Sequence, residues 1–255
     1  MTADRFDLTG RVAVVTGGSR GLGRAIGQAL AEHGATVVVA SRKADACERA
    51  AAEIHEATGR PTLGLACHVG RWEDCEQLLD QVADRCGGID VLVNNAGMSP
   101  LYPALPDVTE ALFDKVVDVN LKGPFRLAVL AGTRMAAAKG GSIINVSSTA
   151  AVEPRDIELP YAAAKAGLNA LTVGLARSFG PSVRVNAIMP GPFLTDVSRA
   201  WDQDAFAEQA QSFALGRGGR PDEIAGAALY LASDASSFTT GAVLKVDGGA
   251  AYAPA

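Results

Sequence analysis

Short apolar runs alternate with longer amphipathic segments along almost the whole chain. The apolar runs are rich in valine and isoleucine and lack polar alternation, as the Thr-Val-Val-Val-Ala sequence of Thr36–Ala40 illustrates. Such runs are typical of parallel strands that are covered on both faces. The strands predicted in this way are Val12–Thr16, Thr36–Ala40, Thr62–Ala66, Ile89–Asn94, Ser142–Ser147, Val183–Met189 and Val243–Val246.

The segments between these runs carry apolar residues at helical spacing. Helices are predicted between Leu22 and Gly34 and over residues 44–58, 73–86, 109–138, 161–179 and 222–233. A regular alternation of strand and helix predicts βαβ units, a parallel sheet and therefore an α/β fold. The chain shows no internal repeat and no linker, so we expect one domain over residues 1–255. Residues 190–220 lack a clear strand, which is typical of a lid or an insertion within such a domain.

Composition and charge exclude several classes of protein. A chain of 255 residues with 48% apolar content can bury a large core, and its net charge of −5 offers no basic field for nucleic acid. No apolar stretch reaches the roughly 18 residues needed to span a bilayer, and the N-terminus lacks the apolar segment of a signal peptide. The four cysteines have no paired metal-ligand spacing. We therefore expect a cytoplasmic protein with reduced cysteines, no metal site and neither a nucleic-acid nor a membrane partner.

A glycine-rich turn, Thr16–Gly23, lies between the first predicted strand and the first predicted helix. Glycines let the backbone approach a phosphate closely, and the free N–H groups and dipole of a helix N-terminus favour a pyrophosphate. A tight turn without a ligand is the alternative. The overlapping G-x-S-x-G pattern of hydrolases is disfavoured, because all three histidines precede residue 70. The candidate cofactor-binding residues of this loop are Gly17, Ser19, Arg20, Gly21, Leu22 and Gly23.

Tyr161 and Lys165 are the candidate acid–base pair. They are four residues apart at the start of a predicted helix, which Pro160 introduces, so they share one helix face. A nearby cation lowers the pKa of a tyrosine and allows it to exchange a proton with a substrate oxygen. A solvated pair on a helix surface would show the same spacing.

Small polar residues follow two further predicted strands. Ser147 and Ser148 end one strand, and Asn94–Gly97 ends another. The carboxyl ends of parallel strands lie at one edge of the sheet, where ligands bind. We therefore expect these residues beside the glycine-rich loop.

These motifs, in this order, resemble the short-chain dehydrogenase/reductase family from Gly10-Arg11-Val12 to Val246-Asp247-Gly248-Gly249. The resemblance implies a Rossmann-type, doubly wound sheet of seven parallel strands with helices on both faces, assembled as a homotetramer. It implies that Ser148, thirteen residues before Tyr161, is the catalytic serine, with Ser147 the less favoured candidate. It also identifies Asn120 as a fourth catalytic residue. The further cofactor contacts that it implies are His68, Val69, Asn94, Ala96, Gly97, Pro190, Gly191 and Thr195.

The implied reaction is hydride transfer between NADP(H) and a carbonyl or secondary alcohol. Ser148 would bind the carbonyl oxygen, Tyr161 would protonate it, and Lys165 would lower the tyrosine pKa and bind the nicotinamide ribose. The resemblance covers carbonyl, ketosugar-acid and 3-oxoacyl reductases, and it leaves the substrate open. A catalytically silent protein that senses or scaffolds through bound NADP is the alternative.

The cofactor preference is expected to depend on the end of the second predicted strand. Ser41 stands where NAD-binding sites usually have a carboxylate, and Arg42 follows. A guanidinium can bind a 2′-phosphate with paired hydrogen bonds, and Arg20 offers a second cation, so NADP(H) is favoured and NAD(H) remains open. His68 and Val69 replace the Asp-Val pair that the family usually has near the adenine.

Three regions allow two interpretations each. The aromatic residues of segment 190–220 either wall an apolar substrate pocket or pack within a helix; they are Phe193, Trp201, Phe206 and Phe213. The charged loop 153–158 faces either substrate or solvent. Small residues on two long helices pack either between subunits or in the protomer's own core; they are Ala128, Ala131, Ala170 and Gly174.

Overall fold

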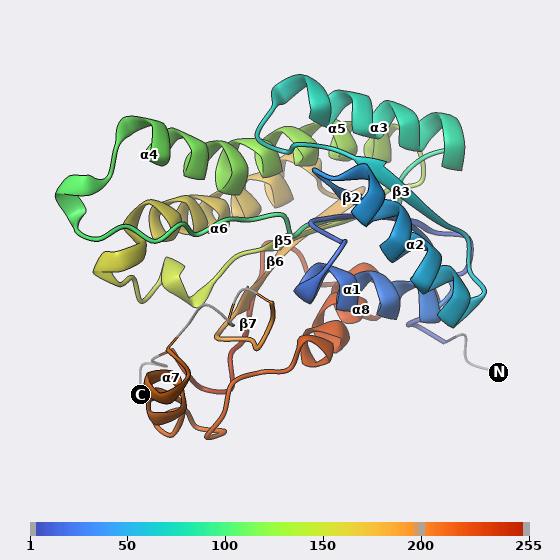
Figure 1. Cartoon of the computed structure of the whole chain (residues 1–255). Helices are drawn as coiled ribbons and strands as arrows, with labels where there is room; N and C mark the ends of the chain where they lie inside the picture. Colours follow the sequence, from blue (N-terminus) through green and yellow to red (C-terminus); the bar gives the residue numbers. More distant parts are fainter. Residues whose placement is uncertain (1–3, 197, 199–201, 252–255) are drawn as a thin grey trace.

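The computed structural model describes residues 4–196, 198 and 202–251, and within them seven strands form one parallel sheet. The strand order is β3-β2-β1-β4-β5-β6-β7, which confirms the predicted Rossmann-type arrangement (Figure 1). The strands are β1 (Val12–Thr16), β2 (Thr36–Ser41), β3 (Thr62–Ala66), β4 (Val91–Asn94), β5 (Gly141–Val146), β6 (Val183–Pro190) and β7 (Val243–Val246).

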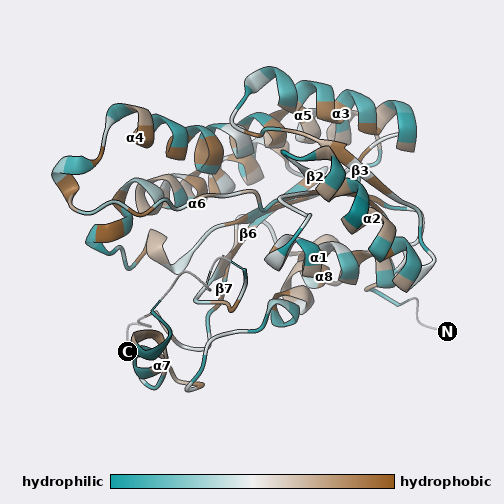
Figure 2. Cartoon of the chain, viewed as in Figure 1, coloured by the Kyte–Doolittle hydropathy of each residue, from teal (hydrophilic) through white to brown (hydrophobic). Residues whose placement is uncertain are grey.

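Helices cover both faces of the sheet. One hydrophobic core joins the sheet to α1 (Gly21–Glu32), α2 (Ala44–Thr58) and α8 (Ala225–Ala232). The other joins it to α3 (Trp72–Cys86), α5 (Gly123–Ala137) and α6 (Leu159–Phe179). The apolar strands lie between the layers, while the helix ribbons carry hydrophilic residues along their outward-facing parts (Figure 2). Two further helices, α4 (Glu110–Val117) and α7 (Gln203–Ala210), are as short as α8.

The central strands place the glycine-rich turn at the reversal of the strand order. β1 pairs with β2 on one side and with β4 on the other, so Val14 lies between Val38 and Leu92. All residues of β1 and β4 are buried. The chain winds outward in opposite directions from this point, and such a switch point is where open α/β sheets bind their ligands, beyond the carboxyl ends of the strands.

The predicted helix over residues 109–138 is interrupted. The structure divides it into α4, a π-helical turn over Asp118–Lys122, and α5. Pro124 lies in the first turn of α5 and has no N–H to donate to the carbonyl of Asn120, four residues earlier. A π-helical turn is a common response to such a break and is often found at functional sites.

Segment 190–220 contains a helix that the apolar pattern did not predict. α7 is short, mostly exposed and low in apolar periodicity, and Asp202 caps it by accepting bonds from the N–H groups of Asp204 and Ala205. At the other predicted elements the boundaries shift by a few residues. α6, for example, begins at Leu159 with Pro160 in its first turn.

Candidate active site

The glycine-rich loop closes tightly against the end of β4. Gly17 and Gly21 have φ angles of +63° and +56°, in the left-handed region that favours glycine. A Cβ on Gly17 would lie 2.9 Å from Ala96 Cα, and one on Gly23 would lie 2.4 Å from Asn95 Nδ2. Residues 17 and 23 therefore have no room for a side chain where the loop meets β4.

The N-terminus of α1 has no internal cap. Arg20 occupies the N-cap position in extended conformation without a capping side-chain bond, and the first turn contains no acidic residue. The N–H groups of the first turn and the positive end of the helix dipole are consequently available to an anion. Thr195 lies against this turn, because a Cβ on Gly21 would be 3.6 Å from Thr195 Cβ.

Thr16 and Asn95 hold the loop in place. Thr16 Oγ1 accepts hydrogen bonds from the backbone N–H groups of Asn95 and Ala96, both at 3.1 Å. The Asn95 amide donates to the carbonyls of Thr16 at 3.0 Å and Gly17 at 3.2 Å. The preceding Asn94 is 1% exposed, and its amide donates to Pro124 O and Asn145 Oδ1, so its side chain is turned into the fold.

Ser148, Tyr161 and Lys165 converge beyond the end of β5. The Ser148 hydroxyl lies near enough to the Tyr161 hydroxyl to influence its pKa. Lys165 is 2% exposed; its Nζ donates to Val146 O at 2.7 Å and lies 5.6 Å from the centroid of the Tyr161 ring. Ser147 is also 2% exposed, but its hydroxyl donates to the carbonyl of Lys165 instead. Of the two serines, the structure therefore brings Ser148 to the tyrosine hydroxyl.

The protonation of this cluster is controlled by burial. Burial raises the pKa of Tyr161 to about 12, the nearby Ser148 hydroxyl lowers it, and the charge of Glu158 raises it. Burial also lowers the pKa of Lys165 to about 8. The expectation that Lys165 lowers the tyrosine pKa is wrong for this structure, because the ammonium lies over the ring and bonds to Val146 O while desolvation dominates at the hydroxyl.

Asn120 lies in the π-helical turn and anchors the segment after β4. Its Oδ1 accepts from Met98 N at 3.2 Å, and its Nδ2 donates to Met98 O at 2.8 Å and Val116 O at 2.9 Å. A Cβ on Gly97 would lie 3.0 Å from Asn120 Oδ1 and 3.7 Å from Lys165 Nζ. Gly97 therefore lets Asn120 and Lys165 approach the same stretch of backbone.

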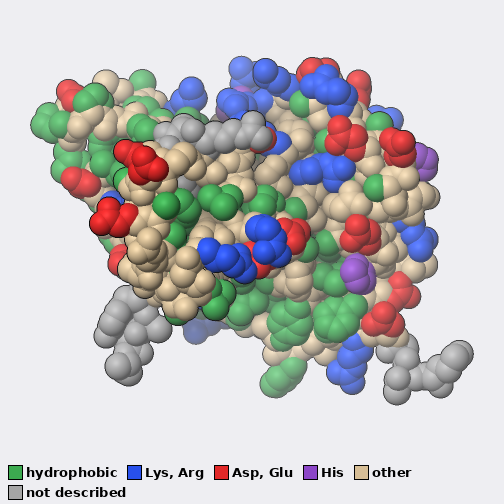
Figure 3. Space-filling model, turned by 60° about the horizontal axis from the view of Figure 1, so that its bottom comes forward, with side chains coloured by type: hydrophobic (Ala, Val, Ile, Leu, Met, Phe, Trp, Pro, Cys, Tyr) green, Lys and Arg blue, Asp and Glu red, His purple; other side chains and the backbone are tan. Residues whose placement is uncertain are grey.

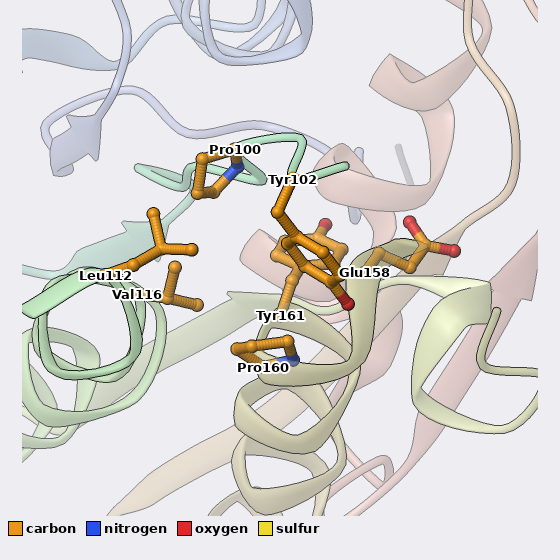
Figure 4. Close-up of a pocket in the computed structure, with 7 residues that line it drawn as sticks. All are labelled: Pro100, Tyr102, Leu112, Val116, Glu158, Pro160 and Tyr161. Carbon is orange, nitrogen blue, oxygen red and sulfur yellow. The ribbon is translucent and has the colours of Figure 1, made fainter. Parts of the chain in front are cut away.

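A small, nearly closed crevice lies beside Tyr161 (Figure 4). The Tyr102 hydroxyl joins its two walls by donating to the carbonyl of Asp156 and accepting from Leu159 N at 2.9 Å. This connection fixes the loop before α6 against the loop after β4. The crevice is lined by Pro100, Tyr102, Leu112, Val116, Glu158, Pro160 and Tyr161.

Known proteins share both the sequence and the fold. Residues 17–251 match a family model described as enoyl-(acyl carrier protein) reductase. Dehydrogenase/reductase SDR family member 4 from Bos taurus is 40% identical over 97% of this chain and 89% of its own length. The chain belongs to the short-chain dehydrogenase/reductase (SDR) family. An NAD-dependent glycerol dehydrogenase from Listeria innocua is 37% identical over 96% of this chain and 95% of its own length. The crystal structure of an NADPH-dependent 3-quinuclidinone reductase from Rhodotorula rubra superimposes with a TM-score of 0.91 at 33% identity, covering 96% of this chain and 93% of that one.

This SDR is accordingly an oxidoreductase of alcohols and carbonyls that uses a nicotinamide cofactor. Its glycine-rich loop fits the pyrophosphate of such a cofactor. The fit follows from the uncapped N-terminus of α1 and from the glycine conformations at residues 17 and 21.

The SDR's predicted adenosine contacts lie at the ends of β2 and β3. Arg42 is exposed and forms no ion pair with any described residue, whereas the Ser41 hydroxyl lies 3.0 Å from Cys47 Sγ. His68 is half-buried, and its Nδ1 accepts from Gly70 N at 3.2 Å, so its neutral ring carries the proton on Nε2. Val69 is buried, and its carbonyl accepts from the Cys75 thiol.

The segment after β6 begins in the sheet and then packs upon itself. Pro190 ends β6, and Gly191 N donates to Val246 O at 3.0 Å. Phe193 is 6% exposed and belongs to the core beside α1 and α8, while the rings of Phe206 and Phe213 meet edge to face at 6.3 Å. Packing within a helix, the second interpretation, fits only Phe206, which lies in α7. Phe193 packs in the core and Phe213 lies after the helix, while Trp201 lies outside the described residues.

Tyr102 escaped the sequence interpretation altogether. Thr16 and Asn95 were placed at the glycine-rich loop and beside it, but the bonds by which they lock the loop were not predicted. A hydroxyl directly before the glycines, and a doubled asparagine after a strand, are the signals that would have indicated the loop lock. No local signal indicated Tyr102, because its partners lie more than fifty residues away in the chain.

The described residues contain no group of three or more histidine, cysteine, aspartate or glutamate side chains placed to hold a metal ion. None of their helices is long and apolar enough to cross a membrane. On the face shown in Figure 3, acidic and basic side chains are interspersed.

Proposed function

We propose that this SDR is an NADP(H)-dependent oxidoreductase that interconverts a small carbonyl compound and its secondary alcohol. The observation that carries the proposal is the convergence of Ser148, Tyr161 and the buried Lys165 ammonium, which lies 5.6 Å from the centroid of the Tyr161 ring. A pair of hydroxyls held in this way can bind one substrate oxygen and exchange a proton with it.

Tyr161 is the proposed proton donor. With a pKa of about 12 its hydroxyl stays protonated at neutral pH, which suits carbonyl reduction. Ser148 donates a hydrogen bond to the same oxygen and stabilises the charge that develops there. The nicotinamide cofactor supplies hydride to the carbonyl carbon, or accepts it in the reverse direction.

Lys165 and Asn120 are the proposed supporting residues. With a pKa of about 8, Lys165 is mostly protonated at neutral pH and can donate to ribose hydroxyls of the cofactor. Asn120 fixes the backbone at Met98 and so keeps Gly97 next to Lys165. The proposed pyrophosphate contacts are Gly17, Ser19, Arg20, Gly21, Leu22, Gly23 and Thr195. The proposed contacts to the rest of the cofactor are Ala96, Gly97, Pro190 and Gly191. Asn94 can contribute only its backbone, because its side chain is turned into the fold.

The proposed preference for NADP(H) is supported by the charges near the end of β2. Ser41 leaves no carboxylate to repel a 2′-phosphate, and the exposed guanidiniums of Arg42 and Arg20 can bind one. Two of the three similar proteins named above differ, since one is described as NAD-dependent and the other as NADPH-dependent. The charges of this chain, rather than its family, therefore carry the preference. His68 and Val69 are proposed to lie beside the adenine.

A homotetramer is the proposed assembly. Of the two interpretations of the small helical residues, packing in the protomer's own core holds for Ala128 and Ala131, because both are 0% exposed there. On α6, by contrast, Ala170 and Gly174 are exposed, next to the 38% exposed Val173. Light scattering of the purified protein tests the assembly.

The decisive experiment is an assay of cofactor oxidation with a panel of ketones. We expect turnover with NADPH, and a lower kcat/KM with NADH. Cofactor binding without turnover of any ketone or alcohol would instead identify a silent NADP-binding protein.

A further inference from the structure

The crevice beside Tyr161 contains one carboxylate. Glu158 lies three residues before Tyr161, at the N-cap of α6, and its side chain is 16% exposed. Its charge acts on the Tyr161 hydroxyl. In Figure 4 the carboxylate of Glu158 and the hydroxyl of Tyr161 project toward the same side of the crevice.

This carboxylate is not used to stabilise the helix. Although Glu158 is the N-cap residue, its side chain accepts no bond from the first turn of α6. Among the described residues its hydrogen bonds are confined to Oε1, which accepts from Arg155 Nε at 3.1 Å. Arg155 is itself 56% exposed, so it binds the carboxylate from the solvent side and does not enclose it.

The other crevice residues near Glu158 offer little to a polar substrate. Pro100, Leu112 and Val116 are apolar. The Tyr102 hydroxyl is already engaged with the backbone at Asp156 and Leu159. Glu158 is therefore the charged acceptor of the crevice, and it stands next to the proposed proton donor.

We propose that Glu158 determines substrate specificity by accepting a hydrogen bond from a donor group on the carbon next to the reacting carbonyl. The inference rests on the proposed function, since it requires the substrate oxygen to lie at Tyr161. Substrates of this class are α-hydroxy ketones and α-amino ketones, together with the corresponding diols and amino alcohols. A hydroxyl or ammonium group would meet Oε2, whereas a plain alkyl ketone would leave a partly desolvated carboxylate without a partner.

Three ketones of matched size test this proposal: hydroxyacetone, aminoacetone and butan-2-one. We expect the protein to reduce the first two with a kcat/KM at least about tenfold higher than that for butan-2-one, the effect of one charge-assisted hydrogen bond. Glu158→Gln should lower this ratio about tenfold for aminoacetone. It should lower the ratio less for hydroxyacetone, because the amide oxygen still accepts from a hydroxyl. Any effect of the lost charge on Tyr161 is shared by the three ketones and cancels in the ratio. Unchanged NADPH affinity should show that the variant folds.

Asp107→Asn is the matched control, because it removes one exposed negative charge from the loop after β4 without altering the crevice lining. It should leave all three rates and their ratios unchanged. Equal changes for the three ketones in Glu158→Gln, or the same ratio change in Asp107→Asn, would overturn the inference and leave the proposed function intact. Failure of the unaltered protein to reduce any of the three ketones, or any of the wider panel, would overturn both.

Discussion

The two ends of the site are built in opposite ways. The pyrophosphate end is made of backbone, with two left-handed glycines, an uncapped helix and a loop held by Thr16 and Asn95. The catalytic end is made of side chains, with two neighbouring hydroxyls and a lysine buried behind the tyrosine ring. The pyrophosphate end binds an anion because its backbone leaves room for one. The catalytic end acts through the atoms of particular side chains.

This difference teaches how each end can fail. A backbone site loses function when an atom is added, because nothing around it can yield. A side-chain site loses function when an atom is removed, because the chemistry belongs to that atom. The two cases predict different kinetic signatures, one in cofactor affinity and the other in turnover.

Removing one oxygen should have the largest effect. Tyr161→Phe keeps the ring above Lys165 but deletes the proton donor, and we expect kcat to fall by about 10²–10⁴-fold. Cofactor affinity, measured by fluorescence titration with NADPH, should change less than about threefold. Substantial reductase activity in this variant would remove Tyr161 from the mechanism.

Adding one methyl group should act on the other end. In Gly23→Ala the new Cβ would lie 2.4 Å from Asn95 Nδ2 and 2.5 Å from Gly17 O, so it would displace the amide that locks the loop. Overpacking of this kind costs about 1–3 kcal/mol, and we expect NADPH affinity to fall about tenfold or more.

Gly226→Ala is the matched control for this change. Gly226 lies in α8 with nothing within 4 Å of the added carbon, so alanine should stabilise the helix by about 0.5–1 kcal/mol and leave affinity unchanged. If both variants bound NADPH normally, the close packing of the loop would have no role in recognition.

Sequence alone predicted the pyrophosphate end of the site better than it predicted segment 190–220. The seven strands and the position of Gly17, Gly21 and Gly23 follow from local patterns, because strand runs and glycine spacing are local properties. Long-range bonds, such as those from Tyr102 to residues beyond 155, leave no periodic trace and could not be predicted. The direction of the Tyr161 pKa was predicted wrongly, since spacing shows that a lysine is near but not how deeply both groups are buried.

Arg42 shares a feature with each end of the site. It is a side chain, but its proposed role is to bind the cofactor and not to take part in the reaction. Arg42→Ala should raise the KM for NADPH about tenfold, the effect of losing one hydrogen bond to a charged group, and leave the KM for NADH within twofold. Arg49→Ala, which removes an exposed arginine paired with Asp45, is the control. A parallel change for both cofactors would assign the 2′-phosphate contact to another residue.

The smallest effect should appear in the pH dependence of stability. Burial lowers the pKa of Lys165 to about 8 from its ordinary value of 10.5. Between these values the unfolded chain binds a proton that the folded protein has lost, so the free energy of unfolding should rise with pH through this window. The slope from one such group is at most about 1.4 kcal/mol per pH unit.

Lys165→Met should remove this slope, and urea unfolding of both proteins without cofactor between about pH 7.5 and 9.5 measures it. The range ends below the ordinary pKa of tyrosine, because the raised pKa of Tyr161 makes the folded protein hold its proton longer and reverses the sign above pH 10. The other titrating groups are shared by the two proteins and cancel in the difference. Parallel stability curves would mean that the Lys165 ammonium is fully solvated or paired in the folded protein. The buried lysine would then no longer distinguish the side-chain end of the site from its backbone end.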